Sequence, residues 1–156
     1  MVLYHSLAQY LLDFKIKRSP IRYNFYQSIL RRDTSLMDIF CTYCSAQKDH
    51  EPGNLPAIQR YQSKRINQIA DSAVKLGIGF YILSGKYGLI ESHMPIPYYN
   101  HLLQPDETAI MVRKVADQLA KADIQTIIFF TNPPEEDPNL GPYLEVIETA
   151  CRNTNV

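Results

Sequence analysis

The stretch Gly79-Phe80-Tyr81-Ile82-Leu83, followed at once by Ser84-Gly85-Lys86-Tyr87-Gly88, decides the fold that we expect for this chain. Its first five residues are almost wholly apolar, which predicts a β-strand covered on both faces. Its next five residues combine two glycines, a hydroxyl and a positive charge, so the chain leaves the strand through a polar loop. We place the candidate site in this loop, Ser84–Tyr99.

Two other short apolar runs, Leu36–Cys41 and Gln125–Thr131, predict further buried strands. Helical periodicity separates and follows these strands, in Ala57–Leu76, in a segment opened by Pro105, and in Pro142–Cys151. The first helix is expected to face inward through Ile66, Ile69, Ala70 and Ala73 and to stop at Gly77. The second is expected to face inward through Val112, Val115, Leu119 and Ala122, with Lys121 in its last turn, and the third through Tyr143, Val146, Ile147 and Ala150. Alternating strands and helices imply right-handed crossovers and a parallel sheet between helical layers. We therefore expect an α/β fold with three layers and a mainly parallel, Rossmann-like sheet.

The first 34 residues predict two helices, Leu3–Phe14 and Ser19–Arg31. We interpret residues 1–34 as an N-terminal helical extension of an α/β domain that comprises residues 35–156. The extension would pack onto the sheet or against a partner chain, so a homo-oligomer through these helices is one expectation. The whole chain would form a single compact domain.

Composition places the chain among globular proteins, with 156 residues, 46% of them hydrophobic and 21% charged. No apolar run approaches the roughly 20 residues that span a bilayer, so we expect no membrane partner. The N-terminus lacks the apolar core of a signal peptide. Three cysteines, an odd number, argue against a disulfide framework and favour a reducing compartment, the cytoplasm.

The formal net charge is zero, but it is unevenly spread along the chain. Residues 1–65 hold ten Lys and Arg against five Asp and Glu, whereas residues 66–156 hold six against eleven. Such asymmetry is typical of a basic face that meets nucleic acid, and equally of two faces that are merely solvated.

Three loops are expected to converge, because ligands of open parallel sheets bind outside the carboxyl ends of the strands. They are Thr42–Pro56, Ser84–Leu103 and Thr131–Pro142. Asn132, in the third loop, is a candidate ligand-binding residue on this ground.

The start of the second loop offers a hydroxyl at Ser84, a positive charge at Lys86, and backbone amides freed by Gly85 and Gly88. These groups could hold a phosphate or the edge of a base. The spacing matches neither a Walker loop nor a nucleophile elbow. The alternative is a glycine-containing turn that only redirects the chain.

The same loop continues into a proline-rigidified arm, Pro95–His101, whose tyrosines could stack on a nucleobase or form a well-packed structural lid. Glu91, His93 and His101 are the candidate acid–base groups. Each of them, taken singly, is equally explained as a solvated loop residue.

Cys41-x-x-Cys44 invites a zinc or dithiol interpretation. Zinc would need two more ligands, and the imidazoles within reach are His50, His93 and His101. We favour Cys41 as a core residue, with Cys44 and Lys48 facing the pocket, and we expect neither a metal nor another cofactor.

The stretch Tyr81–Ile90 (YILSGKYGLI), followed by Ile96-Pro97-Tyr98, resembles the ILSxxYGLI…I-x-PY signature of a large family of uncharacterised bacterial, archaeal and phage proteins. It is also similar to the LSGLYG…QPY run of the YaaA-type peroxide-stress proteins. Upstream, the residues Cys44-Ser45, Lys48, Pro56-Ala57 and Tyr61-x-Ser63 are similar to the CSxxK…PA…LYxS pattern of the first family.

The resemblance implies an α/β fold and an association with nucleic acid or nucleobase metabolism, the peroxide-stress relatives being regarded as DNA-binding. It implies that the pocket residues are Cys44, Lys48, Ser84, Tyr87, Gly88, Pro97 and Tyr98. Gly85 departs from the pattern, because many members of the uncharacterised family have alanine there.

We therefore expect a protein that recognises a nucleobase, a nucleotide or a nucleic acid in a strand-end pocket and acts on base or glycosidic chemistry. The catalytic candidates are Ser84, Lys86, Glu91 and His101, and the ligand-binding candidates are Cys44, Lys48, Gly85, Tyr87, Gly88, Pro97, Tyr98 and Asn132. One alternative is a non-catalytic DNA-binding or oxidative-stress-response protein, and a minor one is a zinc or thiol protein.

Overall fold

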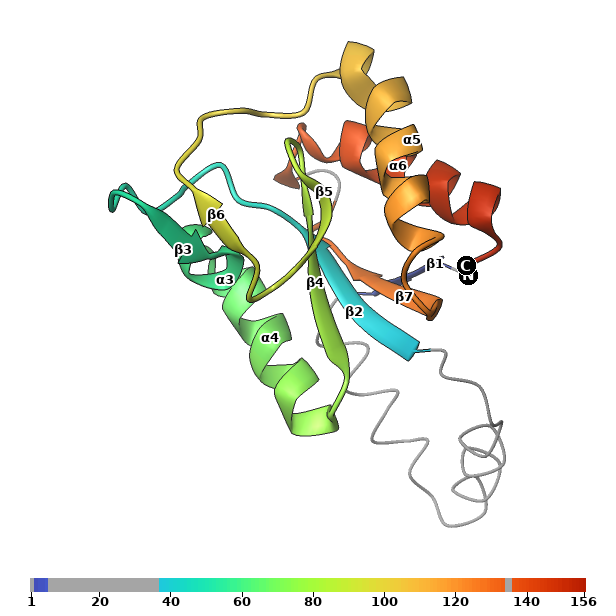
Figure 1. Cartoon of the computed structure of the whole chain (residues 1–156), viewed down its shortest axis with the longest axis horizontal. Helices are drawn as coiled ribbons and strands as arrows, with labels where there is room; N and C mark the ends of the chain where they lie inside the picture. Colours follow the sequence, from blue (N-terminus) through green and yellow to red (C-terminus); the bar gives the residue numbers. More distant parts are fainter. Residues whose placement is uncertain (1, 6–36, 134–135) are drawn as a thin grey trace.

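The computed structural model describes residues 2–5, 37–133 and 136–156 (Figure 1). It has a mixed α/β fold built on a five-stranded sheet of order β1-β7-β2-β4-β5. The strands of this sheet are β1 (Val2–His5), β2 (Met37–Tyr43), β4 (Gly79–Ser84), β5 (Gly88–Glu91) and β7 (Ile124–Phe130). The first four strands in the spatial order pair in parallel, which confirms a mainly parallel sheet.

Strand β5 differs from the expectation that all of residues 84–103 form a loop. It pairs antiparallel with β4, and Ser84 lies opposite Gly88 in the register. The two strands are joined by a very short turn, and Gly88 has a φ of +76°, a conformation that L side chains rarely adopt. A strand of four residues behind such a turn is too short to stand out by periodicity.

The segment 57–76, expected to be one helix, forms two. Helix α3 (Ala57–Arg60) ends at the extended residue Tyr61, and α4 (Lys64–Leu76) begins after Ser63, whose side chain accepts a hydrogen bond from the amide of Ile66. The expected inward face of Ile66, Ile69, Ala70 and Ala73 is buried, and Gly77 ends the helix in the left-handed conformation, as predicted. The break at Tyr61 matters below, because it places the start of α4 beside the strand ends.

The helices that follow β5 pack mainly on each other. After the 3-10 turn η1 (Pro105–Glu107), helix α5 (Thr108–Leu119) contacts β5 and packs along α6 (Leu140–Thr154), which also contacts β1. The expected inward residues Val112, Val115 and Leu119 in α5, and Tyr143, Val146, Ile147 and Ala150 in α6, are buried. Ala122 and Lys121, expected on the helix opened by Pro105, lie beyond the end of α5.

The start of the chain differs from the predicted helix over residues 3–14. Val2–His5 forms strand β1, which pairs in parallel with β7 at the edge of the sheet. The helix prediction is therefore wrong for Leu3, Tyr4 and His5, because an available sheet edge overrides a weak local preference. The rest of that helix and the predicted helix 19–31 lie outside the described residues, and the boundary at residue 34 stays a prediction.

A small second sheet connects the loop after β2 with the loop after β5. It pairs β3 (Asn54–Pro56) antiparallel with β6 (Pro95–Pro97). Beneath it lies Arg60, a fully buried arginine. Its guanidinium donates to the carbonyl oxygens of Asp49 at 2.7 Å, Glu51 at 2.9 Å and Gly53 at 2.6 Å. These contacts fix the path of the loop that carries part of the candidate site.

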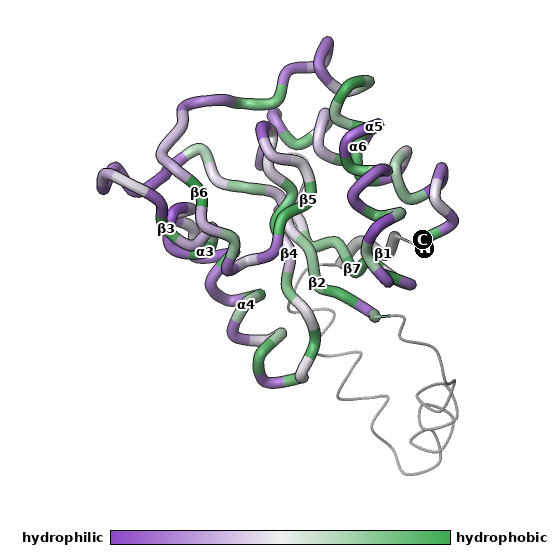
Figure 2. The backbone as a smooth tube through the Cα atoms, in the orientation of Figure 1, coloured by the Kyte–Doolittle hydropathy of each residue, from purple (hydrophilic) through white to green (hydrophobic). Residues whose placement is uncertain are grey.

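The apolar residues concentrate along the central strands, and the connecting loops are mostly hydrophilic (Figure 2). The deepest part of the core includes Ile39 and Phe40 of β2, Ile82 and Leu83 of β4, and Ile127 and Phe129 of β7. No helix among the described residues is long and apolar enough to cross a membrane. The core therefore places the carboxyl ends of β2, β4 and β7 along one edge of a continuous sheet.

Candidate functional site

Two cavities adjoin each other at the carboxyl end of β2. The larger one has a volume of about 480 Å³ and the smaller one about 140 Å³. They share the wall formed by Tyr43, Cys44, Ser45, Ala46 and Asp137. The larger cavity is completed by Ser63, Lys64, Arg65, Gln68 and Asn132, and the smaller one by Lys48, Asn100, His101, Leu102, Asn139 and Tyr143.

The larger cavity lies between the start of α4 and the loop after β7. Ser63, Lys64 and Arg65 occupy the first turn of α4, where amide groups carry a partial positive charge. Asn132 faces them from the β7 loop and adds an amide. This cavity therefore combines two cationic side chains and the carboxylate of Asp137 with neutral hydrogen-bonding groups.

Arg65, Tyr43 and Asp137 form a chain of contacts in the shared wall. The guanidinium carbon of Arg65 lies 3.6 Å from the ring centroid of Tyr43, and its Nη1 donates to the backbone oxygen of Tyr43 at 3.1 Å and to the hydroxyl of Thr42. The Tyr43 hydroxyl donates to Asp137 Oδ2 at 2.8 Å. Burial raises the pKa of Tyr43 to about 12, although the nearby Arg65 opposes the shift, so the hydroxyl stays protonated near neutral pH.

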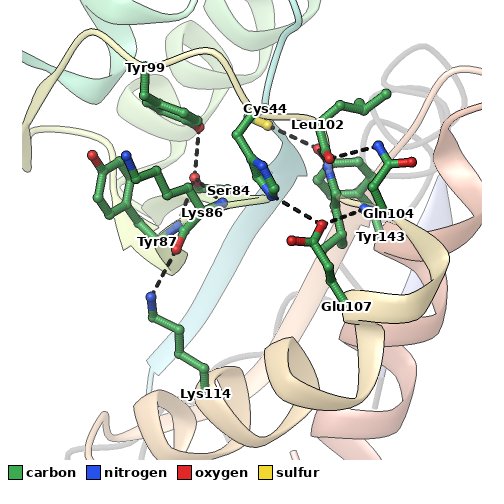
Figure 3. Close-up of polar contacts among 12 residues, drawn as sticks. Cys44, Ser84, Lys86, Tyr87, Tyr99, Leu102, Gln104, Glu107, Lys114 and Tyr143 are labelled. Atoms are coloured by element: carbon green, nitrogen blue, oxygen red, sulfur yellow. Dashed lines mark hydrogen bonds and ion pairs between the residues drawn. The ribbon is translucent and has the colours of Figure 1, made fainter.

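The smaller cavity is lined by the end of β2 with its loop, the loop before η1, the loop after β7 and α6, and Figure 3 draws the contacts of some of these residues. Cys44 comes from the loop after β2, and its Sγ lies 3.5 Å from the hydroxyl of Tyr143 in α6. That hydroxyl also accepts a 3.4 Å hydrogen bond from the amide of Leu103. His101 Nε2 lies 3.2 Å from Glu107 Oε2. The smaller cavity is therefore lined by an amine, an imidazole, a thiol and a phenol, which belong to Lys48, His101, Cys44 and Tyr143.

Ser84, the leading catalytic candidate, is 1% exposed and lines neither of these cavities. Its Oγ accepts hydrogen bonds from the amides of Lys86 at 3.2 Å and Tyr87 at 3.1 Å. It also shares a 2.8 Å hydrogen bond with the hydroxyl of Tyr99, as Figure 3 shows. With three partners, the hydroxyl holds the turn between β4 and β5 in place.

Tyr99 is the centre of this second cluster. Its hydroxyl lies 2.5 Å from that of Tyr61, and burial raises the pKa of both phenols. The amines of Lys48 and Lys86 lie 4.7 and 5.3 Å from the Tyr99 ring centroid, and the ring of Tyr87 meets it edge-on at 5.2 Å. Lys86 and Tyr87 are therefore engaged with a buried tyrosine.

Close packing explains why residues 85 and 88, in the β4–β5 turn, are both glycine. A Cβ at Gly85 would lie 2.9 Å from the Tyr143 hydroxyl and 3.0 Å from the amide nitrogen of Leu103. A Cβ at Gly88 would overlap the side-chain oxygen of Gln118, which accepts from the amide of Leu89 at 2.8 Å. Gln118 also donates to the carbonyl of Tyr87 at 3.0 Å, so it clamps the turn from α5.

The remaining candidates of this loop lie away from the cavities. Glu91 pairs opposite Tyr81, part-way along β4, and accepts a 3.5 Å hydrogen bond from its hydroxyl, so the hairpin carries it away from the strand end. Pro97 pairs with Asn54 in the small sheet. Tyr98 is 42% exposed, and its ring centroid lies 4.4 Å from that of His50.

The structure therefore brings together four of the predicted site residues, Cys44, Lys48, His101 and Asn132, in the walls of the two cavities. Ser84, Gly85, Lys86, Tyr87, Gly88, Glu91, Pro97 and Tyr98 line neither cavity, and their roles in binding or catalysis stay predictions.

Sequence reasoning missed Tyr43, Arg65, Asp137 and Tyr143. The predicted first strand stops at Cys41, whereas β2 continues for two more residues to Tyr43, so Tyr43 was not among the candidates. Arg65 was hidden inside a helix expected to run unbroken from residue 57. Ser63 followed by Lys64 and Arg65 was the available signal, since serine is a preferred residue at the start of a helix.

The zinc interpretation gains no support from the described residues, among which no group of three or more His, Cys, Asp and Glu side chains could hold a metal ion. Cys41, Cys44 and Cys151 are all free and buried. Burial raises the pKa of the Cys41 and Cys151 thiols, the latter to about 11. Cys41 is a core residue, as expected.

Comparison of the chain with models of protein families, with curated proteins and with solved structures finds no match.

Proposed function

We propose that this protein binds a nucleotide in the larger cavity. The observation that carries the proposal is the meeting of Lys64, Arg65 and the start of α4 with the carboxyl ends of β2 and β7. Phosphate groups bind well where helix amides and cationic side chains point into one space. A volume of about 480 Å³ lies within the usual range of small-molecule sites.

In this proposal the phosphate lies at the first turn of α4, and the amides of Gln68 and Asn132 face the base or the sugar. The carboxylate of Asp137, in the shared wall, would repel a second phosphate group of the ligand on that side of the cavity. This arrangement favours a mononucleotide or nucleoside over a compound with many phosphates.

The catalytic part of the proposal, action on the base or the glycosidic bond, is assigned to the adjoining smaller cavity. His101, oriented by Glu107, is the group best suited to transfer a proton there. The likeness to the ILSxxYGLI…PY signature supports the same chemical class. We also retain the three-layer, Rossmann-like arrangement and the cytoplasmic location as parts of this proposal.

The binding test is thermal unfolding with the four ribonucleoside monophosphates, the free bases, ribose 5-phosphate, and single- and double-stranded DNA. A ligand present at 100 times its dissociation constant stabilises the folded state by about 2.7 kcal/mol. We expect at least one monophosphate to raise the melting temperature, and Arg65→Met to weaken that binding by about tenfold or more, the loss of one charge-assisted contact. Arg113→Met, at an exposed position of α5, is the matched control.

The proposal fails if none of these ligands shifts the melting temperature. The alternative, a DNA-binding protein that uses its basic N-terminal half without catalysis, predicts a different pattern. Affinity for DNA would fall steeply with salt and would survive Arg65→Met.

A further inference from the structure

Lys48 is a lysine whose position is unusual. It is only 6% exposed, although lysines are almost never fully buried unless paired. Its backbone forms an isolated bridge with Tyr61, and the next residue, Asp49, donates its amide to the carbonyl of Arg60 at 2.8 Å. The side chain therefore starts from a well-fixed segment of the loop after β2.

The amine of Lys48 lies among aromatic rings and one carbonyl. Its Nζ is 4.7 Å from the ring centroid of Tyr99 and 5.8 Å from that of Tyr61, and it donates to the carbonyl of Ala46 at 3.4 Å. Within the described residues it forms no ion pair with a carboxylate. The titratable groups packed around it are the phenols of Tyr61 and Tyr99 and the thiol of Cys44. His101, Asp137 and Tyr143 line the same cavity as Lys48.

Burial lowers the pKa of the Lys48 amine below its ordinary value of 10.5, and Cys44 opposes this shift. Each unit of lowering increases the neutral fraction of an amine at pH 7 about tenfold. The neutral amine is the nucleophilic form, and buried lysines of this kind form Schiff bases with carbonyl compounds.

The smaller cavity provides the space for such a reaction. Lys48 and Cys44 line it on one side, and Asn100, His101 and Tyr143 line it on others. Its volume of about 140 Å³ admits a small compound. It shares the wall formed by Tyr43–Ala46 and Asp137 with the larger cavity, so the two cavities lie side by side.

We propose that Lys48 is a covalent carbonyl-binding residue, whose amine condenses with a small aldehyde in the smaller cavity. The neutral amine attacks the carbonyl carbon, a C–N bond forms, and proton transfer from nitrogen to oxygen gives a carbinolamine. This intermediate loses its hydroxyl group and the remaining N–H proton as one water molecule, which leaves an imine. The step needs no oxidant or reductant, and His101 is placed to supply and take back the proton.

The aldehyde class that fits best is a ring-opened sugar. Loss of a base from a nucleoside leaves a sugar that opens to an aldehyde, so only the source of this aldehyde rests on the proposed function. The covalent reaction itself needs no bound nucleotide. A failure of nucleotide binding and a failure of Lys48 to react are therefore distinguishable.

The opposing explanation is that Lys48 only packs on the rings of Tyr61 and Tyr99, a cation–π contact that stabilises the loop. In that case the amine would be less reactive than the exposed lysines, because it is shielded. The two explanations differ in which lysine reacts first.

The test uses the unmodified full chain with glycolaldehyde or 2-deoxyribose at pH 7 and sodium cyanoborohydride, which traps an imine as a stable secondary amine. Peptide mapping by mass spectrometry then gives the extent of labelling at each lysine. We expect Lys48 to be labelled at least about twofold faster than Lys64, Lys86 and Lys114, which are exposed, and its labelling to persist at lower pH than theirs.

A Lys48→Met variant, which keeps most of the apolar stem, should lose the fast-labelling site while the slow labelling of exposed lysines is unchanged. The proposal is overturned if the exposed lysines react as fast as Lys48. It is also overturned if Lys48 reacts only after the chain is unfolded in urea. Because the mapping is carried out on the wild-type chain, a variant that failed to fold would not affect this result.

Discussion

Two polar loops follow neighbouring buried strands at the same edge of the sheet, yet they use their side chains in opposite ways. After β4, the residues Ser84–Gly88 form a closed turn whose hydroxyl and charged group contact Tyr99. After β2, the residues Tyr43–Lys48 line two cavities. The difference shows that only the loop after β2 presents its groups in the walls of these cavities.

Ser84 illustrates the first case and Arg65 the second. The Ser84 hydroxyl already has three hydrogen-bond partners within the protein. Arg65 donates to groups of β2 through one nitrogen, Nη1, while its side chain also lines the larger cavity. A guanidinium has five N–H donors, so Arg65 retains donors for a ligand.

The largest expected effect concerns the closed turn. Gly88→Ala should lower the free energy of unfolding by more than about 2 kcal/mol, because Gln118 must move away from the added Cβ and give up its hydrogen bonds to Leu89 and Tyr87, in addition to the cost of a left-handed backbone. Gly77→Ala is the matched control: Gly77 has a φ of +67°, but no atom lies within 4 Å of the added Cβ. Its expected cost is about 1 kcal/mol.

Urea unfolding of both variants measures this difference. Equal losses at the two positions would mean that the Gln118 clamp contributes nothing, and that the turn after β4 is not the rigid element that the comparison requires.

The next effect separates stability from binding. Ser84→Ala should cost about 1–3 kcal/mol of stability, because it leaves the amides of Lys86 and Tyr87 and the Tyr99 hydroxyl without this partner. It should leave the affinity for any nucleotide that stabilises the wild type within about twofold, a change under 0.5 kcal/mol. Calorimetric titration below the melting temperature of the variant provides the measurement.

A Ser84→Ala variant that folds as stably as the wild type but no longer binds would contradict the roles assigned to the loops after β4 and β2. The closed turn would then be the binding element, as the sequence predicted.

The smallest effect concerns alkaline pH and the shared wall. Burial raises the pKa of Tyr43 to about 12 from its ordinary value of 10. A raised folded-state pKa means that this stabilisation is present below pH 10 and is lost as the pH rises through 12. Between pH 10 and 12 we therefore expect the wild type to lose more stability than Tyr43→Phe, which has no phenol to ionise there.

Unfolding curves at pH 8, 10 and 11 test this expectation, with Tyr98→Phe as the control at an exposed position. Parallel losses in the wild type and Tyr43→Phe would show that the Tyr43 hydroxyl is accessible to solvent, and hence that the shared wall is open.

The sequence predicted the parallel strands and most of the buried helix faces, because apolar periodicity is a local signal that burial enforces. It did not predict β5, which is too short to show a period, or β1, which forms because the edge of β7 is available. The break at Tyr61 was missed for a related reason. Its extended backbone depends on the buried ring and on the bridge to Lys48.

The sequence by itself determined the central strands, the edge at which polar loops gather, and the presence of Cys44, Lys48, His101 and Asn132 near it. Only the tertiary structure decided which polar groups contact each other and which line a cavity. Hydrogen bonds such as that between Ser84 and Tyr99, and packing such as that of Arg65 on Tyr43, join residues far apart in the chain. Local sequence patterns do not predict such contacts, because each contact depends on how separate helices, strands and loops pack together.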